Sequence, residues 1–67
     1  MDRSSTRGKI RSAVKSAQTY SERVFYHCSR AVELADKKHP VINAHMTTAM
    51  GGLIILIEEL NKMFPQL

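Results

Sequence analysis

A run of five branched apolar residues, Leu53 to Ile57, most constrains what this 67-residue chain can fold into. The run follows Gly51 and Gly52 in a segment whose apolar residues are spaced as in an α-helix. Because successive helical residues differ by about 100°, five consecutive apolar residues cover nearly every face of a helix. One neighbouring helix covers only one side of them. The sequence therefore predicts an association that buries the other side.

A first helix is predicted from Lys9 to the segment just before Pro40, because its apolar residues recur at helical spacing. A helix of roughly 30 residues is about 45 Å long. Pro40 either ends this helix or begins the next one, where its missing N–H has no cost. The predicted apolar stripe consists of Ile10, Ala13, Val14, Ala17, Tyr20, Val24, Phe25, Cys28, Ala31, Val32 and Ala35.

A second helix is predicted to begin near Val41 or Asn43 and to end at Phe64, because Pro65 follows. The short connection makes the two helices an antiparallel hairpin. The expected fold class is all-α, with two long helices in a hairpin that associates into a four-helix bundle, as a homodimer or with a helical partner protein. The main stripe of the second helix is Ile42, Met46, Ala49, Met50, Leu53, Leu56, Ile57, Leu60 and Phe64.

The oligomer interface is expected on the other side of the second helix, where small residues form a groove. Each glycine inside a helix costs about 0.8–1 kcal/mol relative to alanine, so two in succession indicate a close contact. Burying one isoleucine beside the groove is worth roughly 1.5–3 kcal/mol, against a total stability of about 5 kcal/mol. The predicted interface consists of Ala44, Thr48, Gly51, Gly52 and Ile55.

The net charge of +4 belongs to the N-terminal end of the chain. Residues 1–15 carry five basic residues and one acidic residue, whereas residues 16–67 carry five of each. Residues 1–8 are polar and rich in serine. We expect them to form a flexible basic arm ahead of a helical hairpin domain at residues 9–67.

Four basic residues near this end recur at intervals of four. If the helix extends through the arm, they form a slanted cationic row, which suits contact with nucleic-acid phosphates. The alternative is a solvated helix end that is kept soluble by its charge, and Gly8 interrupts the row. The residues of the row are Arg3, Arg7, Arg11 and Lys15.

A tyrosine lies on the polar side of the first helix, between two arginines. Tyrosine beside arginine is the composition of anchor residues in protein interfaces. Alternatively, the ring simply covers the methylene groups of its neighbours. The residues of this predicted contact are Tyr26, Arg23 and Arg30.

The sequence predicts neither a metal site nor a catalytic centre. The single cysteine, Cys28, excludes an internal disulfide. Cys28 and His27 are adjacent and point about 100° apart, and no pair of ligands at zinc spacing accompanies them. Glu58 and Glu59 diverge in the same way. We expect no cofactor, and a chain this short has little room for a pocket beside its core.

The longest weakly polar run, residues 44–57, has 14 residues, fewer than the roughly 20 that span a bilayer. No signal peptide is recognisable, because Ile10 is the first apolar residue after Met1. We therefore expect no membrane partner and a cytoplasmic location, or a nuclear one in a eukaryote. The expected function is a non-enzymatic interaction or adaptor protein that self-associates and regulates a larger protein. The alternative is a dimeric nucleic-acid-binding regulator that uses the basic arm.

Overall fold

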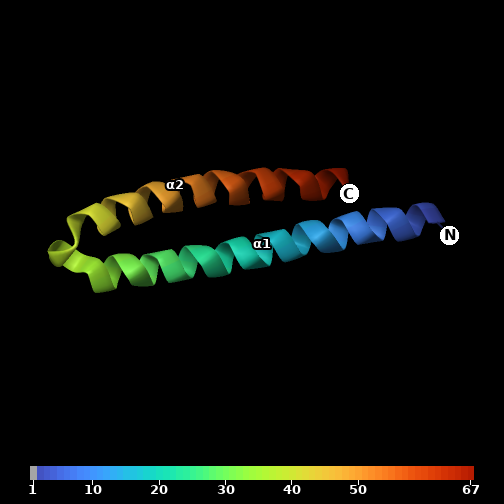
Figure 1. The fold of residues 1–67 in the computed structure, drawn as a ribbon. Coiled ribbons are helices and arrows are strands. Elements are labelled where there is room, and N and C mark those ends of the chain that lie inside the picture. Colours follow the sequence, from blue (N-terminus) through green and yellow to red (C-terminus); the bar gives the residue numbers. More distant parts are fainter. Residues whose placement is uncertain (1) are drawn as a thin grey trace.

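The chain folds into two long helices that lie side by side and run in opposite directions (Figure 1). The computed structural model describes residues 2–67, and the side chains of residues 6–67. Helix α1 spans Asp2–Ala35 and helix α2 spans Pro40–Met63. Two 3₁₀ turns, η1 (Asp36–Lys38) and η2 (Phe64–Gln66), follow them. The predicted all-α antiparallel hairpin is confirmed.

The helices contact each other through one seam with a seven-residue repeat. On both helices the seam residues advance by alternating steps of three and four, which is the packing pattern of a coiled coil. The buried and half-buried residues at this spacing on α1 are Val14, Gln18, Ser21, Phe25, Cys28, Val32 and Ala35. Ser29 and Ala31 are also half-buried and lie beside this line. The α2 members of the seam are Asn43, Met46, Met50, Leu53, Ile57, Leu60 and Phe64.

This seam is narrower than the apolar stripes predicted from sequence. Ile10, Tyr20 and Val24 of the first predicted stripe are exposed, as are Ile42 and Leu56 of the second. An apolar stripe that is 100° wide needs neighbours on more than one side, whereas a single helix covers only the narrow coiled-coil line. The hairpin therefore leaves apolar surface that its own two helices do not use.

A polar contact lies beside the seam, near the open end of the hairpin. The amide of Gln18 donates a hydrogen bond to the side-chain oxygen of Asn61, which joins α1 to α2. Polar residues at core positions of coiled coils select one register, at some expense of stability. Gln18 and the buried Ser21 occupy such core positions on α1.

The turn between the helices is built around Asp36, whose φ of 46° is left-handed. Asparagine and aspartate adopt this conformation more readily than other residues with a side chain. The backbone N–H of Asn43 donates to the carbonyl oxygen of His39 at 2.9 Å, and Pro40 occupies the first position of α2. These contacts reverse the chain within a few residues and begin α2.

Helix α1 begins at Asp2, so residues 2–8 continue it without a break. The sequence places the start of this helix at Lys9 and assigns residues 1–8 to an arm. Met1 lies outside the described residues. The flexibility expected of the arm stays a prediction. The cationic row requires the helix to extend through the arm, and the backbone of residues 2–8 is helical.

The hairpin has a thin core. Among the described side chains, only Ser21, Ala35 and Leu60 are buried, and no large side chain is completely enclosed. The accessible surface is 5471 Å², whereas a compact monomer of this mass exposes roughly 4,300 Å². The radius of gyration is 16.0 Å, against roughly 11 Å for a compact domain of this length. One copy of the chain is therefore a thin rod.

Leu60→Ala should lower the free energy of unfolding by about 2–5 kcal/mol, because Leu60 is the largest buried side chain of the seam. The matched control is Val41→Ala, since Val41 is 68% exposed on α2; its effect should stay within about 0.5 kcal/mol. Urea unfolding followed by circular dichroism measures both variants. Equal losses would mean that the seam is not the core.

Asp36→Val should destabilise the hairpin by about 1–2 kcal/mol, because a β-branched residue in the left-handed region strains the backbone. Asp36→Gly removes that strain and should be neutral or stabilising. Thermal unfolding of the two variants tests the turn. A similar melting temperature for both would contradict the left-handed conformation at residue 36.

Candidate interaction surfaces

The basic N-terminal turns of α1 extend beyond the end of α2 (Figure 1). Arg7 and Arg11 are exposed on these turns, and Lys15 is exposed beside the end of α2, while the side chain of Arg3 lies outside the described part of the chain. At intervals of four residues the row turns by about 40° per step around the helix. Gly8 is helical and does not interrupt it.

These cations have no carboxylate partner within the described side chains, where the one ion pair joins Lys62 Nζ to Glu59 Oε2 at 2.9 Å. The hydrogen bond from Lys62 to Glu59, followed by the charge attraction between them, raises the pKa of Lys62. Both groups are exposed, so the pair contributes little to stability. Among the described side chains, Arg7, Arg11 and Lys15 are therefore available to an external anion.

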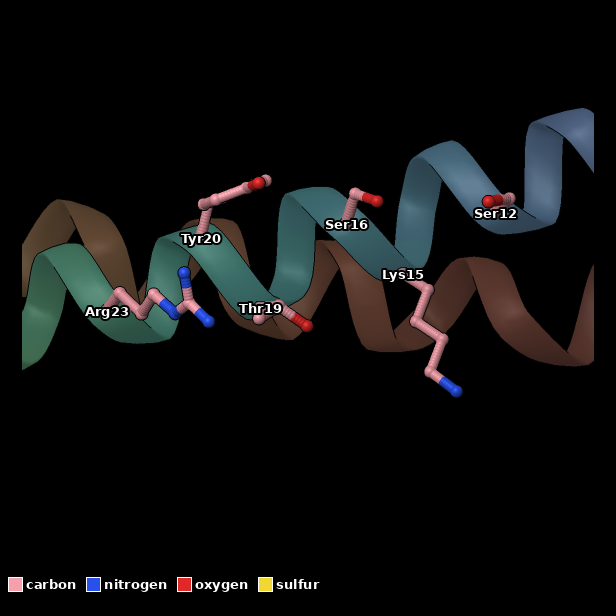
Figure 2. Close-up of a pocket in the computed structure, with 6 residues that line it drawn as sticks. All are labelled: Ser12, Lys15, Ser16, Thr19, Tyr20 and Arg23. Atoms are coloured by element: carbon pink, nitrogen blue, oxygen red, sulfur yellow. The ribbon is translucent and has the colours of Figure 1, made fainter.

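A shallow dip on the surface of α1 lies next to the basic end (Figure 2). One helix supplies all of its lining, and α2 passes behind it. Figure 2 shows Tyr20 pointing to one side of α1 and Lys15 to the other. A dip lined by a single helix encloses no ligand. The lining residues are Ser12, Lys15, Ser16, Thr19, Tyr20 and Arg23.

The residues of the predicted contact around Tyr26 all lie on α1, and their role in binding a partner stays a prediction. Tyr26 is exposed, and its ring meets that of His27 edge-on, with centroids 5.4 Å apart. The guanidinium carbon of Arg23 instead lies 5.5 Å from the ring centroid of Tyr20, in cation–π geometry. The spacing of three residues between Tyr20 and Arg23 is the sequence signal for this pair. Arg30 is exposed.

The five residues predicted as an oligomer interface are all exposed on α2. A Cβ atom added to Gly51 or to Gly52 would meet no atom within 4 Å, so no contact inside the hairpin requires either glycine. Thr48 Oγ1 donates to the carbonyl oxygen of Ala44 at 3.1 Å, which turns the hydroxyl toward its own helix. Ile55 is 63% exposed. Their role in assembly stays a prediction.

The repeat of the seam also divides the exposed residues into two flanks. Residues that immediately precede seam residues lie on one flank of each helix, and residues that immediately follow lie on the other. Two antiparallel helices are related by a two-fold axis that is perpendicular to the plane containing both helix axes. Rotation about this axis exchanges the helices but does not exchange the two faces of the hairpin. The residues that immediately precede seam residues on α1 and on α2 therefore share one face.

We call this surface the apolar face. Its α1 members precede seam positions and are Ala13, Ala17, Tyr20, Val24, His27, Ala31 and Leu34, with Ile10 continuing the line. Its α2 members are Ile42, His45, Ala49, Gly52, Leu56, Glu59 and Met63. The opposite flank, the polar face, is formed by Lys15, Thr19, Glu22, Tyr26, Ser29 and Glu33 on α1 and by Ala44, Thr47, Gly51, Ile54, Glu58 and Asn61 on α2.

The segment Pro40–Gln66 is long and apolar enough, by length and composition alone, to cross a membrane. A core helix of a soluble protein passes the same test. The 14-residue run considered above, residues 44–57, contains threonines, which a spanning helix tolerates. Thr47, for example, donates to the carbonyl oxygen of Asn43 at 2.8 Å, which satisfies its hydroxyl within the helix. The expected lack of a membrane partner stays a prediction.

No group of three or more histidine, cysteine, aspartate or glutamate side chains within the described residues is arranged to hold a metal ion. Cys28 is a free, half-buried thiol in the seam. No protein-family model, curated protein or solved structure matches the chain.

Proposed function

We propose that this chain is a small non-enzymatic interaction or adaptor protein, which self-associates into a four-helix bundle and regulates a larger protein partner. The observation that carries the proposal is the apolar surface left outside the seam. Among the side chains of residues 6–67, eleven large hydrophobic ones are exposed, and the buried apolar ones are Ala35 and Leu60 alone. Soluble chains rarely expose so much apolar surface unless another molecule covers it.

Association also accounts for the length of the helices. Two helices with one seam stabilise a domain less than a bundle in which each helix has two neighbours. A second hairpin, or a helical partner protein, supplies the missing neighbours without any change of fold. An open dip lined by α1 alone gives a substrate little enclosure, which favours a binding role over a catalytic one.

The exposed polar side of α1 supplies the surface for a larger partner. Tyr26 offers a rigid ring with a hydroxyl, and Arg30 lies one turn further along the same helix. Rings of this kind contribute much of the binding energy in protein interfaces. We expect binding to the larger partner to persist at high salt and to be lost in Tyr26→Ala.

Self-association is tested by sedimentation equilibrium of the intact chain at micromolar concentration. The expected mass is twice that of the chain. Gly52→Leu should return the mass toward that of one chain, because its side chain enters space that is open in the hairpin and closed in the assembly. An unchanged mass in this variant would count against any interface that includes Gly52.

A second candidate function is nucleic-acid binding by the basic end. It is favoured by the course of α1, whose first turns extend past α2. Arg7, Arg11 and Lys15 are exposed near this end, with no carboxylate partner among the side chains of residues 6–67. In a dimer two such ends are available. Binding would release counterions from phosphates and would therefore weaken steeply with salt.

For this second function, binding to duplex DNA or RNA should fall steeply between 50 and 200 mM salt and vanish when residues 1–11 are deleted. Arg7→Gln combined with Arg11→Gln should reduce the slope of log K against log salt by about 2. Lys62→Gln is the control, since it removes a cation that pairs with Glu59. Filter binding across a salt series measures the slope. A slope that does not respond to the double variant excludes the row.

A further inference from the structure

We infer that a second copy of this chain covers the apolar face, with its long axis reversed, so that α1 packs on the partner's α1 and α2 on the partner's α2. This inference rests on the proposed self-association and names its surface. The interface inferred here is the apolar face, which contains Leu56, and not the groove around Ile55 that the sequence predicts. The two residues are adjacent in sequence but point about 100° apart.

The exposed large hydrophobic residues are concentrated on this face. Seven of the eleven belong to it, and Leu56 at its centre is 45% exposed. The other four are divided between the polar face and the back of the hairpin. The small residues between them, such as Ala17, Ala49 and Gly52, allow close approach of another helix. A face of this composition suits an apolar partner along its whole length.

Charge separates the two faces equally clearly. Between Ile10 and Met63, Glu59 is the only charged residue at the positions of the apolar face. The polar face carries Lys15, Glu22, Glu33 and Glu58. Packing two polar faces together would remove these charges from water without partners, which is expensive. Packing two apolar faces together leaves them in solvent.

The surface area points to a second copy as the occupant. The hairpin exposes 5471 Å², which is roughly 1,200 Å² more than a compact monomer of its mass. A standard protein interface buries about 800 Å² on each partner. One hairpin of equal length and width covers this excess, and four helices around one core are a closed arrangement.

The basic ends decide the orientation. Residues 1–15 carry a net charge of +4, so two copies aligned end with end would bring these charges together. Reversing one copy moves the two basic ends apart toward opposite ends of a rod that is 56 Å long. This separation is several times the screening length of about 8–10 Å at physiological salt.

The reversed arrangement places the dyad near the middle of the apolar face, at Val24 on α1 and at Leu56 on α2. These two residues lie at nearly the same level of the rod, because Gln18 contacts Asn61 and Asn43 contacts Asp36. Val24 therefore lies close to its own counterpart in the other copy. Leu34 lies ten residues along α1, so that the two copies of Leu34 are about 30 Å apart. With parallel copies, each α1 would instead pack on the partner's α2, and the two copies of Leu34 would lie at the same level on diagonally opposite helices.

The first test compares Leu56→Lys with Ile55→Lys by sedimentation equilibrium at micromolar concentration. We expect the intact chain to be a dimer, Leu56→Lys to weaken dimerisation by at least 100-fold, and Ile55→Lys to remain dimeric. A dimeric Leu56→Lys variant, or loss of the dimer in Ile55→Lys, overturns the inference while leaving self-association intact. A monomeric intact chain overturns both. If that monomer binds phosphatidylcholine vesicles, the apolar face belongs to a lipid surface.

The second test does not depend on a destabilised variant. In a Cys28→Ala background, single cysteines replace Val24, Leu34 or Arg23, which lies on the back of α1. Mild oxidation should give a disulfide-linked dimer with Val24→Cys and none with Leu34→Cys or Arg23→Cys, as seen by non-reducing electrophoresis. Cross-linking through Leu34→Cys overturns the reversed orientation. Cross-linking only through Arg23→Cys would show that the apolar face is not the dimer interface.

Discussion

The seam between α1 and α2 is the contact on which the rest of the structure depends. Its seven-residue repeat brings Phe25, Leu53 and Leu60 between the helices and determines which residues face outward. The seam is long but only one side chain wide, so no large residue within the described part of the chain is completely enclosed. A hairpin held by such a seam has two flanks that differ in polarity. This difference favours association through the apolar face and leaves the polar face in solvent.

The same seam explains how one short chain can have several surfaces. The apolar face suits a second copy of the chain, the polar face carries Tyr26, and the basic turns of α1 extend beyond α2. In the reversed dimer proposed here, the two basic ends lie far apart and the two Tyr26 side chains stay exposed. Assembly and partner binding would then use different sides of the helices. This separation is what a small adaptor or a two-site nucleic-acid binder requires.

Much of the fold was predictable from the sequence, because apolar periodicity and two prolines determine where the helices lie. Helix α2 begins at Pro40 and ends beside Pro65, close to the predicted limits. The exposure of Ile54 and Ile55 also follows from the apolar run. The candidate surfaces were less predictable. The cation–π pair of Tyr20 and Arg23 was missed, because a wide helical stripe does not show which of its residues the partner helix covers.

By itself, the sequence determined that this chain forms two helices, that they fold back on each other, and that α2 is too apolar for one neighbour. These properties follow from local spacing, since side chains three and four residues apart share a helix face. Only the tertiary structure decided that Leu60 is buried while Leu56 is exposed, and that Ile10, Tyr20 and Val24 lie outside the seam. The reason is geometric. The rotation of one helix against the other selects a narrow line from a wide stripe, and that rotation depends on contacts between residues far apart in the chain.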